Sequence, residues 1–571
     1  MSKIRPERAF TKKSINAFAG IRDAAVSNES SAADMRNFRI LKDGILEKRY
    51  GWYTWRNFRE EIRGFWQGTL GEKHLYFLVS GASVYYGTED LGMSSIGTVS
   101  AGGKIGFFRF GDRLYLQDGS VLRVFEPATL TFVKAHGYAP LYGLNWHPVQ
   151  FGDTYEPLNL LTPRLRVHYL NTEGSATIYL PFFAASLDKV RVNNQTTTSY
   201  SFSAGSDRFI LNSPRAGDVV EVAFTISGDN VTRNQIHAST QSFLYQDGEN
   251  ERILLFGSTP GYRLFCSAEA DEKRVNESRV FYSDSDSLYF RSSQILSVGD
   301  ADHPITALCA NHNRILAFHT AGAWSINLDA KSDEVSSYPV LYGFGCTSPD
   351  AVLTLGNDPI LINESGVCRL HSTVGDPDRF SVKILSDKIP SRITFTMKKN
   401  ALLFWDAPHG ELWVRDATET DQGLVWIWNE ALEEWYCFDG IPATLFFRRN
   451  GEVAFAAANR LLQFHTGYYI DGGNDYTAYY DSNYMSMSRS DRCKRSLRAT
   501  FCVHSRGSVL ICDLDADGNS YQFSFAGENT QVPEFFDIRA LPGRFRFLRY
   551  RISCAENVPA RIYEANFYTR L

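Results

Sequence analysis

Cysteine pairs at metal-binding spacing are missing from this sequence. Its nine cysteines include no two that are separated by only two residues, and most lie in apolar stretches typical of strands. Structural zinc sites require such paired spacings. We therefore expect no metal site, and we interpret the cysteines as small buried side chains of a protein that folds in a reducing cytosol.

Long apolar runs and catalytic signatures are missing as well. No stretch approaches the roughly 18 apolar residues of a membrane-spanning helix, and the basic N-terminus is not followed by the apolar stretch of a signal peptide. The nucleophile-elbow, zinc-protease, P-loop and dinucleotide-binding fingerprints are also not found. We expect no stable membrane insertion, no cofactor, no catalytic residues and no enzyme activity.

A strong excess of basic residues is likewise not present, because 59 Lys and Arg stand against 64 Asp and Glu. A dedicated nucleic-acid-binding protein would show such an excess. Basic residues do gather near the two ends of the chain, and they form either solvated strand faces or a surface for an acidic partner or passing DNA. These residues are Lys3, Arg5, Arg8, Lys12, Lys13, Arg489, Arg492, Lys494, Arg495, Arg498, Arg544, Arg546, Arg549 and Arg551.

Aromatic residues are abundant, at 14% of the chain, and they recur in a hairpin pattern. Each repeat has an apolar strand, a turn of Gly, Asp, Asn or Ala, and a second strand rich in aromatics, which is the signal of a β-hairpin. Most neighbouring repeats are spaced by about 40–50 residues, the length of a propeller blade. The repeats lie at residues 74–88, 113–127, 252–267, 314–329, 359–372, 401–417 and 452–467.

This spacing predicts an all-β fold with a β-propeller of six to seven blades. An open array of hairpins or a pair of sandwiches is the alternative, but neither requires a steady period. We expect an extended N-terminal arm with one short helix around Ala32–Phe38, a propeller, an inserted β-sandwich and a C-terminal β-sandwich. The corresponding ranges are 1–62 for the arm, 63–145 and 246–467 for the propeller, 146–245 for the insertion and 468–571 for the C-terminal domain.

Two short motifs suggest chemistry but are better explained as turns. The segment DLDADG places Asp513, Asp515 and Asp517 at the spacing of a calcium loop, yet its twelfth position is Ser524 and its flanks read as strands. The segment YSDSDSLYF (282–290) resembles the Asp-box of sialidase propellers but lacks the Gly and Trp of that motif. We expect hairpin turns at both places.

The segment 14–52 carries a family resemblance. It contains an F-x-G element, then A-x-D-x-x-N, then D-G-x-L-x-x-R-x-G, and it resembles the N-termini of bacteriophage tail proteins of the nozzle or head–tail stabilisation type. The insertion (Lys189–Asn194) and the C-terminal region (around Lys494 and Arg544–Arg551) extend this resemblance. The motif residues are Phe18, Gly20, Ala33, Asp34, Asn37, Asp43, Gly44, Leu46, Arg49 and Gly51.

The resemblance implies a structural protein of the virion tail. Such a chain would form a homo-oligomeric ring, with six-fold symmetry suspected, between portal or adaptor proteins and tail fibres or spikes. DNA would pass through the ring during ejection without sequence-specific binding. The residues expected to take part in assembly are Lys12, Lys13, Phe18, Asp34, Asn37, Arg49, Arg492, Lys494, Arg495, Arg544, Arg546 and Arg549.

Two other classes of function stay open. The first is a propeller that binds carbohydrates or a receptor, with tryptophans of the blade strands as stacking platforms. The second is a sialidase-like hydrolase. The tryptophans in question are Trp324, Trp405, Trp413, Trp426, Trp428 and Trp435. On the tail-protein hypothesis, a deletion of residues 1–30 is expected to leave the propeller folded and to block assembly.

Overall fold

The computed structural model confirms an all-β fold that combines a β-propeller with β-sandwiches. Helices are limited to α1 (Val231–His237), α3 (Phe395–Asn400) and the 3₁₀ turn η1 (Pro349–Ala351) within the part of the chain that is described. The structure describes residues 11–23, 29–88, 92–247, 250–257, 278–299, 304–312, 314–328, 335–373, 376–486, 493–530, 532–540, 542 and 544–570.

The chain divides into two compact units. Residues 62–345 form one unit, and residues 1–61 together with 346–571 form the other. We call them the middle unit and the terminal unit. The terminal unit therefore combines the two ends of the sequence in one folded body.

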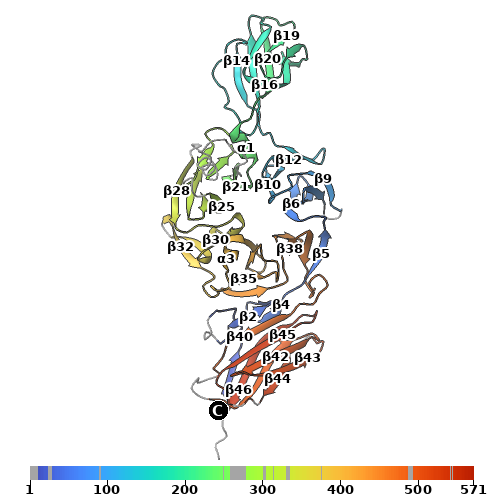
Figure 1. The fold of residues 1–571 in the computed structure, drawn as a ribbon, viewed down its shortest axis with the longest axis vertical. Coiled ribbons are helices and arrows are strands. Elements are labelled where there is room, and N and C mark those ends of the chain that lie inside the picture. Colours follow the sequence, from blue (N-terminus) through green and yellow to red (C-terminus); the bar gives the residue numbers. More distant parts are fainter. Residues whose placement is uncertain are drawn as a thin grey trace, which may run out of the picture. The chain divides into compact units, whose positions relative to one another are not determined.

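Four antiparallel sheets of four consecutive strands make up most of the middle unit (Figure 1). The first two contain β6 (Ile62–Leu70), β7 (Lys73–Ser80), β8 (Ser83–Gly87), β9 (Ser94–Thr98), β10 (Gly106–Phe110), β11 (Arg113–Gln117), β12 (Leu122–Glu126) and β13 (Thr131–Lys134). The other two contain β21 (Gln241–Asp247), β22 (Asn250–Phe256), β23 (Arg279–Tyr282), β24 (Ile295–Ser297), β25 (Ile305–Asn311), β26 (Arg314–His319), β27 (Gly322–Leu328) and β28 (Val335–Tyr342).

These four sheets stack face to face in chain order. Phe77 of β7 packs on Phe125 of β12, and Tyr115 of β11 shares a buried core with Ile253 of β22. The next strand residue, Leu254, faces the other way and joins a core with β26. Because successive side chains of a strand point to opposite faces, a sheet buried on both sides needs an apolar run without alternation. The six buried residues of β26 show that pattern.

The insertion is a separate sheet that folds over its own core. Its strands are β14 (Leu141–Trp146), β15 (Arg164–Asn171), β16 (Thr177–Val192), β17 (Gln195–Thr196), β18 (Tyr200–Phe202), β19 (Ser206–Leu211) and β20 (Asp218–Ile226). The long strand β16 pairs with β19 through its first half and with β20 through its second half. The sheet begins before the predicted boundary at 146, and β21, inside the predicted insertion, belongs to a propeller sheet instead.

The terminal unit continues the propeller sheets. One sheet contains β29 (Val352–Leu355), β30 (Asp358–Asn363), β31 (Gly366–Thr373) and β32 (Asp376–Ile384), and the next series contains β33 (Ala401–Asp406), β34 (Glu411–Asp416), β35 (Val425–Asn429) and β36 (Glu434–Phe438). A further sheet contains β37 (Leu445–Arg449), β38 (Glu452–Ala457), β39 (Arg460–Phe464) and β5 (Trp52–Asn57). The N-terminal strand β5 thus completes a sheet whose other strands lie some 400 positions later.

The remaining N-terminal strands join the C-terminal domain. They are β1 (Thr11–Ile15), β2 (Ala32–Arg36), β3 (Phe38–Ile40) and β4 (Leu46–Lys48). Strand β2 lies between β36 and β40 and links a propeller sheet to the C-terminal domain, whereas β1 and β4 pair with β46. The described part of the segment 1–62 is therefore extended, but its strands are paired within the unit and do not form a free arm.

The expected helix around Ala32–Phe38 is wrong. Residues 32–36 form strand β2, and Asn37 adopts a left-handed backbone with φ of 59°. Pairing with β40 along most of its length supplies β2 with the backbone hydrogen bonds that an isolated helix of seven residues would lack. Long-range pairing therefore overrides the local helix signal of this segment.

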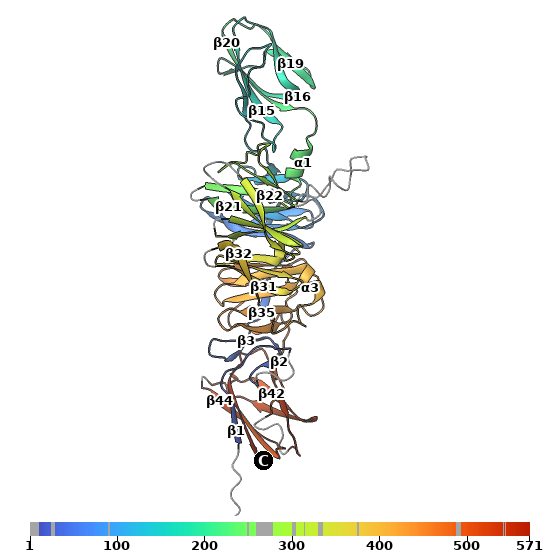
Figure 2. The same cartoon turned by 90° about the vertical axis from the view of Figure 1, so that its left-hand side faces the viewer.

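The C-terminal domain consists of two sheets around an aromatic core. Its own strands are β40 (Ala478–Ser482), β41 (Ser496–His504), β42 (Val509–Ala516), β43 (Asn519–Ala526), β44 (Glu534–Ala540), β45 (Leu548–Cys554) and β46 (Arg561–Arg570). Figure 2 shows the blue strand β1 among these red strands. Phe501, Tyr550 and Phe567 pack against one another between the sheets, with ring centroids 5.1–5.9 Å apart.

No helix of the described residues has the length and apolar character needed to cross a membrane.

Candidate functional site

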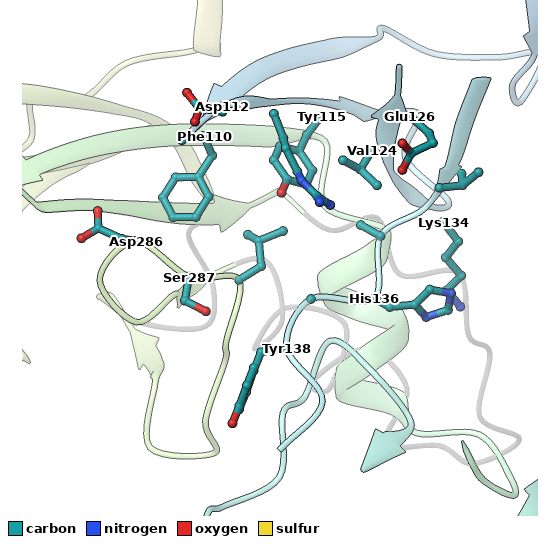
Figure 3. Close-up of a pocket in the computed structure, with 16 residues that line it drawn as sticks. Phe110, Asp112, Tyr115, Val124, Glu126, Lys134, His136, Tyr138, Asp286 and Ser287 are labelled. Atoms are coloured by element: carbon teal, nitrogen blue, oxygen red, sulfur yellow. The ribbon is translucent and has the colours of Figure 1, made fainter. Parts of the chain in front are cut away.

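A cavity of about 480 Å³ opens in the middle unit where the propeller sheets meet the segments leading to the insertion. It is lined by aromatic, basic and acidic side chains together (Figure 3). Tyr138 is 38% exposed, whereas Phe110 and Tyr115 are almost fully buried and form the floor. The labelled lining residues are Phe110, Asp112, Tyr115, Val124, Glu126, Lys134, His136, Tyr138, Asp286 and Ser287.

The wall of this cavity is held in place by one buried amide. Asn159, which is 2% exposed, donates hydrogen bonds from Nδ2 to the carbonyl oxygens of Tyr138 (2.8 Å) and Leu288 (3.0 Å). Its Oδ1 accepts from the backbone N–H of Phe290 (3.1 Å). Gly137 has a φ of +63° and lies so close to Leu288 that an added Cβ would overlap the Leu288 carbonyl oxygen. The cavity therefore has a rigid backbone on this side.

A second cluster, Asp406, His409 and Glu411, brings three potential metal ligands within 4.8 Å of one another in the terminal unit. Arginines already neutralise both carboxylates: Arg448 binds Asp406, and Arg39 binds Glu411 through two nitrogens. Glu411 also accepts hydrogen bonds from Tyr436 (2.5 Å) and Trp413 (3.1 Å). A cation would have to displace these partners, so the cluster fits a structural ion-pair network better than a metal centre.

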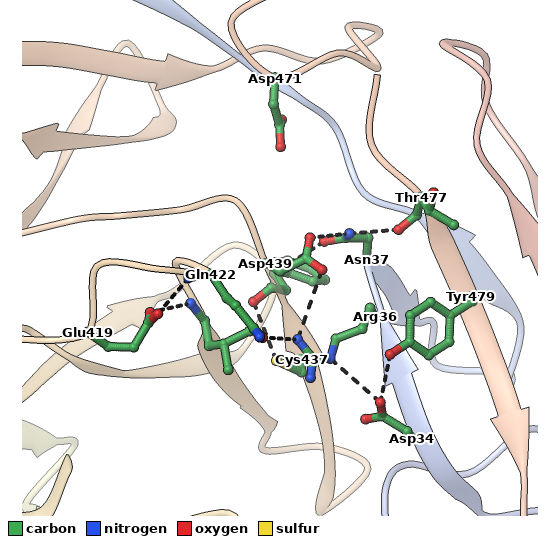
Figure 4. Close-up of polar contacts among 12 residues, drawn as sticks. Asp34, Arg36, Asn37, Glu419, Gln422, Cys437, Asp439, Asp471, Thr477 and Tyr479 are labelled. Carbon is green, nitrogen blue, oxygen red and sulfur yellow. Dashed lines mark hydrogen bonds and ion pairs between the residues drawn. The ribbon is translucent and has the colours of Figure 1, made fainter. Parts of the chain in front are cut away.

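The N-terminal motif residues Asn37 and Arg49 form the centre of a third, buried network. Asn37 Nδ2 donates to Asp439 (2.6 Å) and to the Thr477 carbonyl (2.8 Å), and its Oδ1 accepts from Arg49 Nε (2.8 Å). Figure 4 shows Asn37 between Asp439 and Thr477. Arg49 is 2% exposed, and it pairs with Asp471 and lies over the ring of Tyr476.

The Asp471 carboxylate keeps Arg49 charged. Burial by itself lowers the pKa of the guanidinium, but the paired carboxylate outweighs burial and raises that pKa above its ordinary value. Burial raises the pKa of Asp471, and Arg49 opposes that rise. The Arg49–Asp471 pair and the Asn37–Asp439 hydrogen bonds connect the N-terminal segment to β36 and to the start of the C-terminal domain.

The glycines and the phenylalanine of the same motif are required by close packing. A Cβ on Gly20 would overlap the Trp435 carbonyl oxygen, and a Cβ on Gly51 would overlap the Ile470 carbonyl oxygen. Gly44 has a φ of +75°. Phe18 is 3% exposed and packs edge-on against Tyr480, with ring centroids 5.2 Å apart. These motif positions thus allow the N-terminal segment to pack closely in the terminal unit.

The predicted assembly residues separate into an internal and an exposed group. Asp34 accepts a hydrogen bond from Tyr479, Lys13 pairs with Glu29, and Arg549 pairs with Asp481. Lys494 is fully buried and donates to the carbonyl oxygens of Ser486 and Arg546. Arg492 lies outside the described residues. Lys12, Arg495, Arg544 and Arg546 are exposed.

Both short acidic motifs are turns, as expected. Strands β42 and β43 form a hairpin whose turn residues, Asp517 and Gly518, have positive φ angles. Asp517 accepts hydrogen bonds from the backbone N–H groups of Arg546 and Phe547, so its carboxylate connects this turn to the segment before β45. In the second motif, Asp284 pairs with Arg291 and Asp286 has a φ of 54°.

The tryptophans considered as sugar platforms are mostly internal. Trp413, Trp426, Trp428 and Trp435 are at most 4% exposed, and Trp435 donates its indole N–H to the Leu385 carbonyl (2.7 Å). They stabilise the propeller sheets and cannot stack on a ligand. The residues that sequence reasoning missed are those of the cavity. Lys134 ends β13 and His136 follows two residues later, whereas Asp286 lies in the loop between β23 and β24, and no local spacing connects that loop with β13.

Comparisons with known proteins give no family assignment. No protein-family model matches the chain, and no curated protein matches it. Among solved structures, a catalytically inactive virginiamycin B lyase from Staphylococcus aureus is 8% identical, with a TM-score of 0.33 over 73% of this chain and 98% of that chain. A GH32 β-fructofuranosidase from Bombyx mori is 8% identical, with a TM-score of 0.23 over 92% and 94%.

A smaller solved structure also appears among the similar ones. The carbohydrate-binding module TmCBM61, solved with β-1,4-galactotriose, is 14% identical and covers 21% of this chain and 70% of its own, with a TM-score of 0.14. At such identities and TM-scores, these likenesses carry no argument about what this chain binds or catalyses.

Proposed function

We propose that this chain is a non-enzymatic structural protein of a bacteriophage tail, of the nozzle or head–tail stabilisation type, that assembles into a ring. One observation carries the proposal: the N-terminal motif that resembles this family consists of residues with specific structural roles. Asn37, Arg49 and Gly51 make contacts that join the N-terminal segment to the C-terminal part of the chain. A motif whose residues each have such a structural role supports a shared fold better than a chance match of residue types does.

The carboxylates of the two polar clusters already have hydrogen-bond or ion-pair partners within the protein, which supports a non-catalytic role. In the described residues, the carboxylates of the Asp406–His409–Glu411 group and of the Asn37–Arg49 network are bound by arginines and amides. A general acid or base needs a titratable group that can reach a substrate. These groups instead hold strands together.

Four predicted basic residues have the exposure that an assembly contact needs. Lys12, Arg495, Arg544 and Arg546 lie on the surface of the terminal unit. Complementary charge between subunits guides association and fixes register more than it adds affinity. We therefore assign subunit contacts to this group and not to the buried motif residues.

The proposal is tested by negative-stain electron microscopy and mass photometry of the purified chain over a range of concentrations. Closed rings are expected at high concentration, and Arg544→Glu/Arg546→Glu should prevent them. Lys189→Glu, which changes a basic residue of the insertion, is the control and should leave the rings intact. Monomers at every concentration would contradict ring assembly.

A second candidate function, saccharide binding, is favoured by the cavity of the middle unit. An exposed aromatic ring, Tyr138, lies there with the hydrogen-bonding side chains of Glu126 and Ser287. Sugar rings stack on aromatic faces while their hydroxyl groups bind such side chains. The volume of about 480 Å³ fits a small ligand.

A glycan array, followed by calorimetry, tests this second function. Tyr138→Ala should abolish binding of any glycan that is found, whereas Tyr155→Ala, which removes another exposed tyrosine of the middle unit, should not. An array without any signal would reject saccharide binding and leave the structural proposal untouched.

A further inference from the structure

Four polar residues gather where helix α1 meets the segment that follows β13. Ala135 and Ile236 pack in one buried core. Lys134 and His136 flank Ala135, and His237 follows Ile236. Arg233 lies one helical turn before His237, and its charge acts on both Lys134 and His237. Figure 3 shows the side chains of Lys134 and His136 beside each other at one end of the cavity.

Several polar atoms of this group are buried without a partner. Arg233 donates from one terminal nitrogen to the Thr162 carbonyl (3.3 Å), but its Nε is buried and makes no hydrogen bond. Nδ1 of His136 and Nδ1 of His237 are also buried and have no hydrogen-bond partner among the described residues. Buried donors in native proteins are nearly always satisfied, so such atoms indicate a missing partner.

His237 does not supply that partner. Its Nε2 lies 3.2 Å from the Leu161 carbonyl oxygen, and because a carbonyl only accepts, this nitrogen carries the proton. Burial, together with Lys134 and His136, lowers the pKa of His237 to about 3, so its ring is neutral. The residue anchors α1 and leaves the donors of Arg233 and His136 unused.

The group also has too little negative charge. In the described part of the chain, no carboxylate forms an ion pair with Lys134 or Arg233. Burial and mutual repulsion lower the pKa of the Lys134 ammonium, and burial lowers that of the Arg233 guanidinium. Asp229 is the acidic group that acts on both, whereas Asp188 pairs with Arg164. An added anion would satisfy the charge and the donors together.

We propose that Lys134 and His136, which line the basic end of the cavity, form a binding site for a phosphate group together with Arg233, which lies behind them on α1. Lys134 supplies a charge that reaches the cavity, His136 donates from Nδ1, and Arg233 supplies its unused Nε–H. The site rests on neither the tail-protein proposal nor the saccharide proposal. It takes inorganic phosphate or the phosphate of a larger molecule.

The rest of the cavity favours the larger molecule. Tyr138, Ser287 and Asp286 line the cavity beyond Lys134 and His136 and offer a ring face, a hydroxyl and a carboxylate. A volume of about 480 Å³ is several times that of a phosphate ion. A sugar phosphate would place its phosphate at the basic end and its hydroxyl groups against these residues.

Isothermal titration calorimetry of the full chain tests the site with three probes: inorganic phosphate, glucose 1-phosphate and glucose. Saturable binding of the two phosphates is expected, and it should weaken at least tenfold in Lys134→Gln and in Arg233→Gln. Lys189→Gln should bind as the wild type does. A chloride titration at matched ionic strength separates phosphate binding from general screening.

The three probes distinguish the sources of the phosphate. Tighter binding of glucose 1-phosphate than of inorganic phosphate supports the site and assigns it to a sugar phosphate, and equal binding supports it as a site for the free ion. Because Arg233→Gln could unfold α1, the Lys134→Gln variant, whose side chain is exposed, decides the outcome. Absence of saturable phosphate binding, or equal binding by Lys134→Gln, would overturn the proposal.

Discussion

At the scale of single residues, the motif Asn37–Arg49 shows how one buried charge connects distant segments. Asn37 uses both donors of its amide and accepts with its oxygen, and Arg49 reaches Asp471 and the Asp439 carbonyl. A fully satisfied buried network specifies one arrangement, because any other leaves polar groups without partners. The main effect of the motif is therefore to specify how the two chain ends pack together, and its contribution to the net stability of the fold is secondary.

Arg49→Met is expected to destabilise the terminal unit by about 3–5 kcal/mol, since it leaves the buried Asp471 without its counter-charge. Urea unfolding followed by tryptophan fluorescence measures this loss. The double variant Arg49→Met/Asp471→Leu should recover part of it, because the unpaired charge is gone.

The matched control is Arg208→Met, which removes an arginine whose side chain is 54% exposed and contacts Asp207 and Tyr179. An exposed pair contributes less than about 1 kcal/mol. If Arg49→Met cost no more than this control, the charge pair would have no structural role.

At the scale of elements, strands from the two ends of the chain complete each other's sheets. Strand β5 pairs with β39, β2 lies between β36 and β40, and β1 covers an edge of β46. An uncovered strand edge exposes a row of unpaired backbone groups and invites aggregation. The N-terminal segment therefore protects edges that the later strands would otherwise leave open.

Deletion of residues 1–30 is accordingly expected to destabilise the terminal unit, and not merely to block assembly as the free-arm hypothesis assumed. It removes β1 and the buried side chains of Ile15, Phe18 and Ile21. Hydrogen–deuterium exchange should accelerate in β46 and β40. The sheets of the middle unit are the internal control and should exchange at the wild-type rate. Unchanged exchange in β46 would restore the free-arm hypothesis.

At the scale of the whole molecule, the insertion has a core of its own. Trp146, Tyr169, Val222 and Phe224 are buried in one cluster that contains only residues of the insertion. Leu161 and Ile236, by contrast, pack in a propeller core. The segment between β14 and β15 and the helix that follows β20 therefore pack in the propeller core, and these two contacts anchor the insertion.

A fragment of residues 139–229 is expected to fold alone, since its core is complete and its size is sufficient for a small domain. Circular dichroism should show strands and a cooperative thermal transition. Val222→Asp, which places a charge in the core, should abolish the transition. Ala223→Asp, at a less buried position of β20 opposite Arg166 and Lys189, should not. A fragment without a transition would mean that the propeller is needed to fold the insertion.

The sequence alone determined the strands, the hairpins and most of the turns, because period-two patterns and turn residues act over a few positions. The hairpins at 74–88, 113–127, 314–329, 359–372, 401–417 and 452–467 are paired strands, while the second half of 252–267 lies outside the described residues. The predicted number of blades stays a prediction.

Only the tertiary structure decided which distant strands pair and which side chains meet. The pairing of β1 with β46 joins residues 550 or more positions apart, and no local pattern around Thr11 encodes that partner. Lys134, His136 and Arg233 likewise come together because Ala135 and Ile236 share a core, and contacts of this kind depend on three-dimensional packing. Local propensity thus determined the secondary structure of this protein. Burial of apolar surface, which involves residues far apart in the chain, determined which elements pack together.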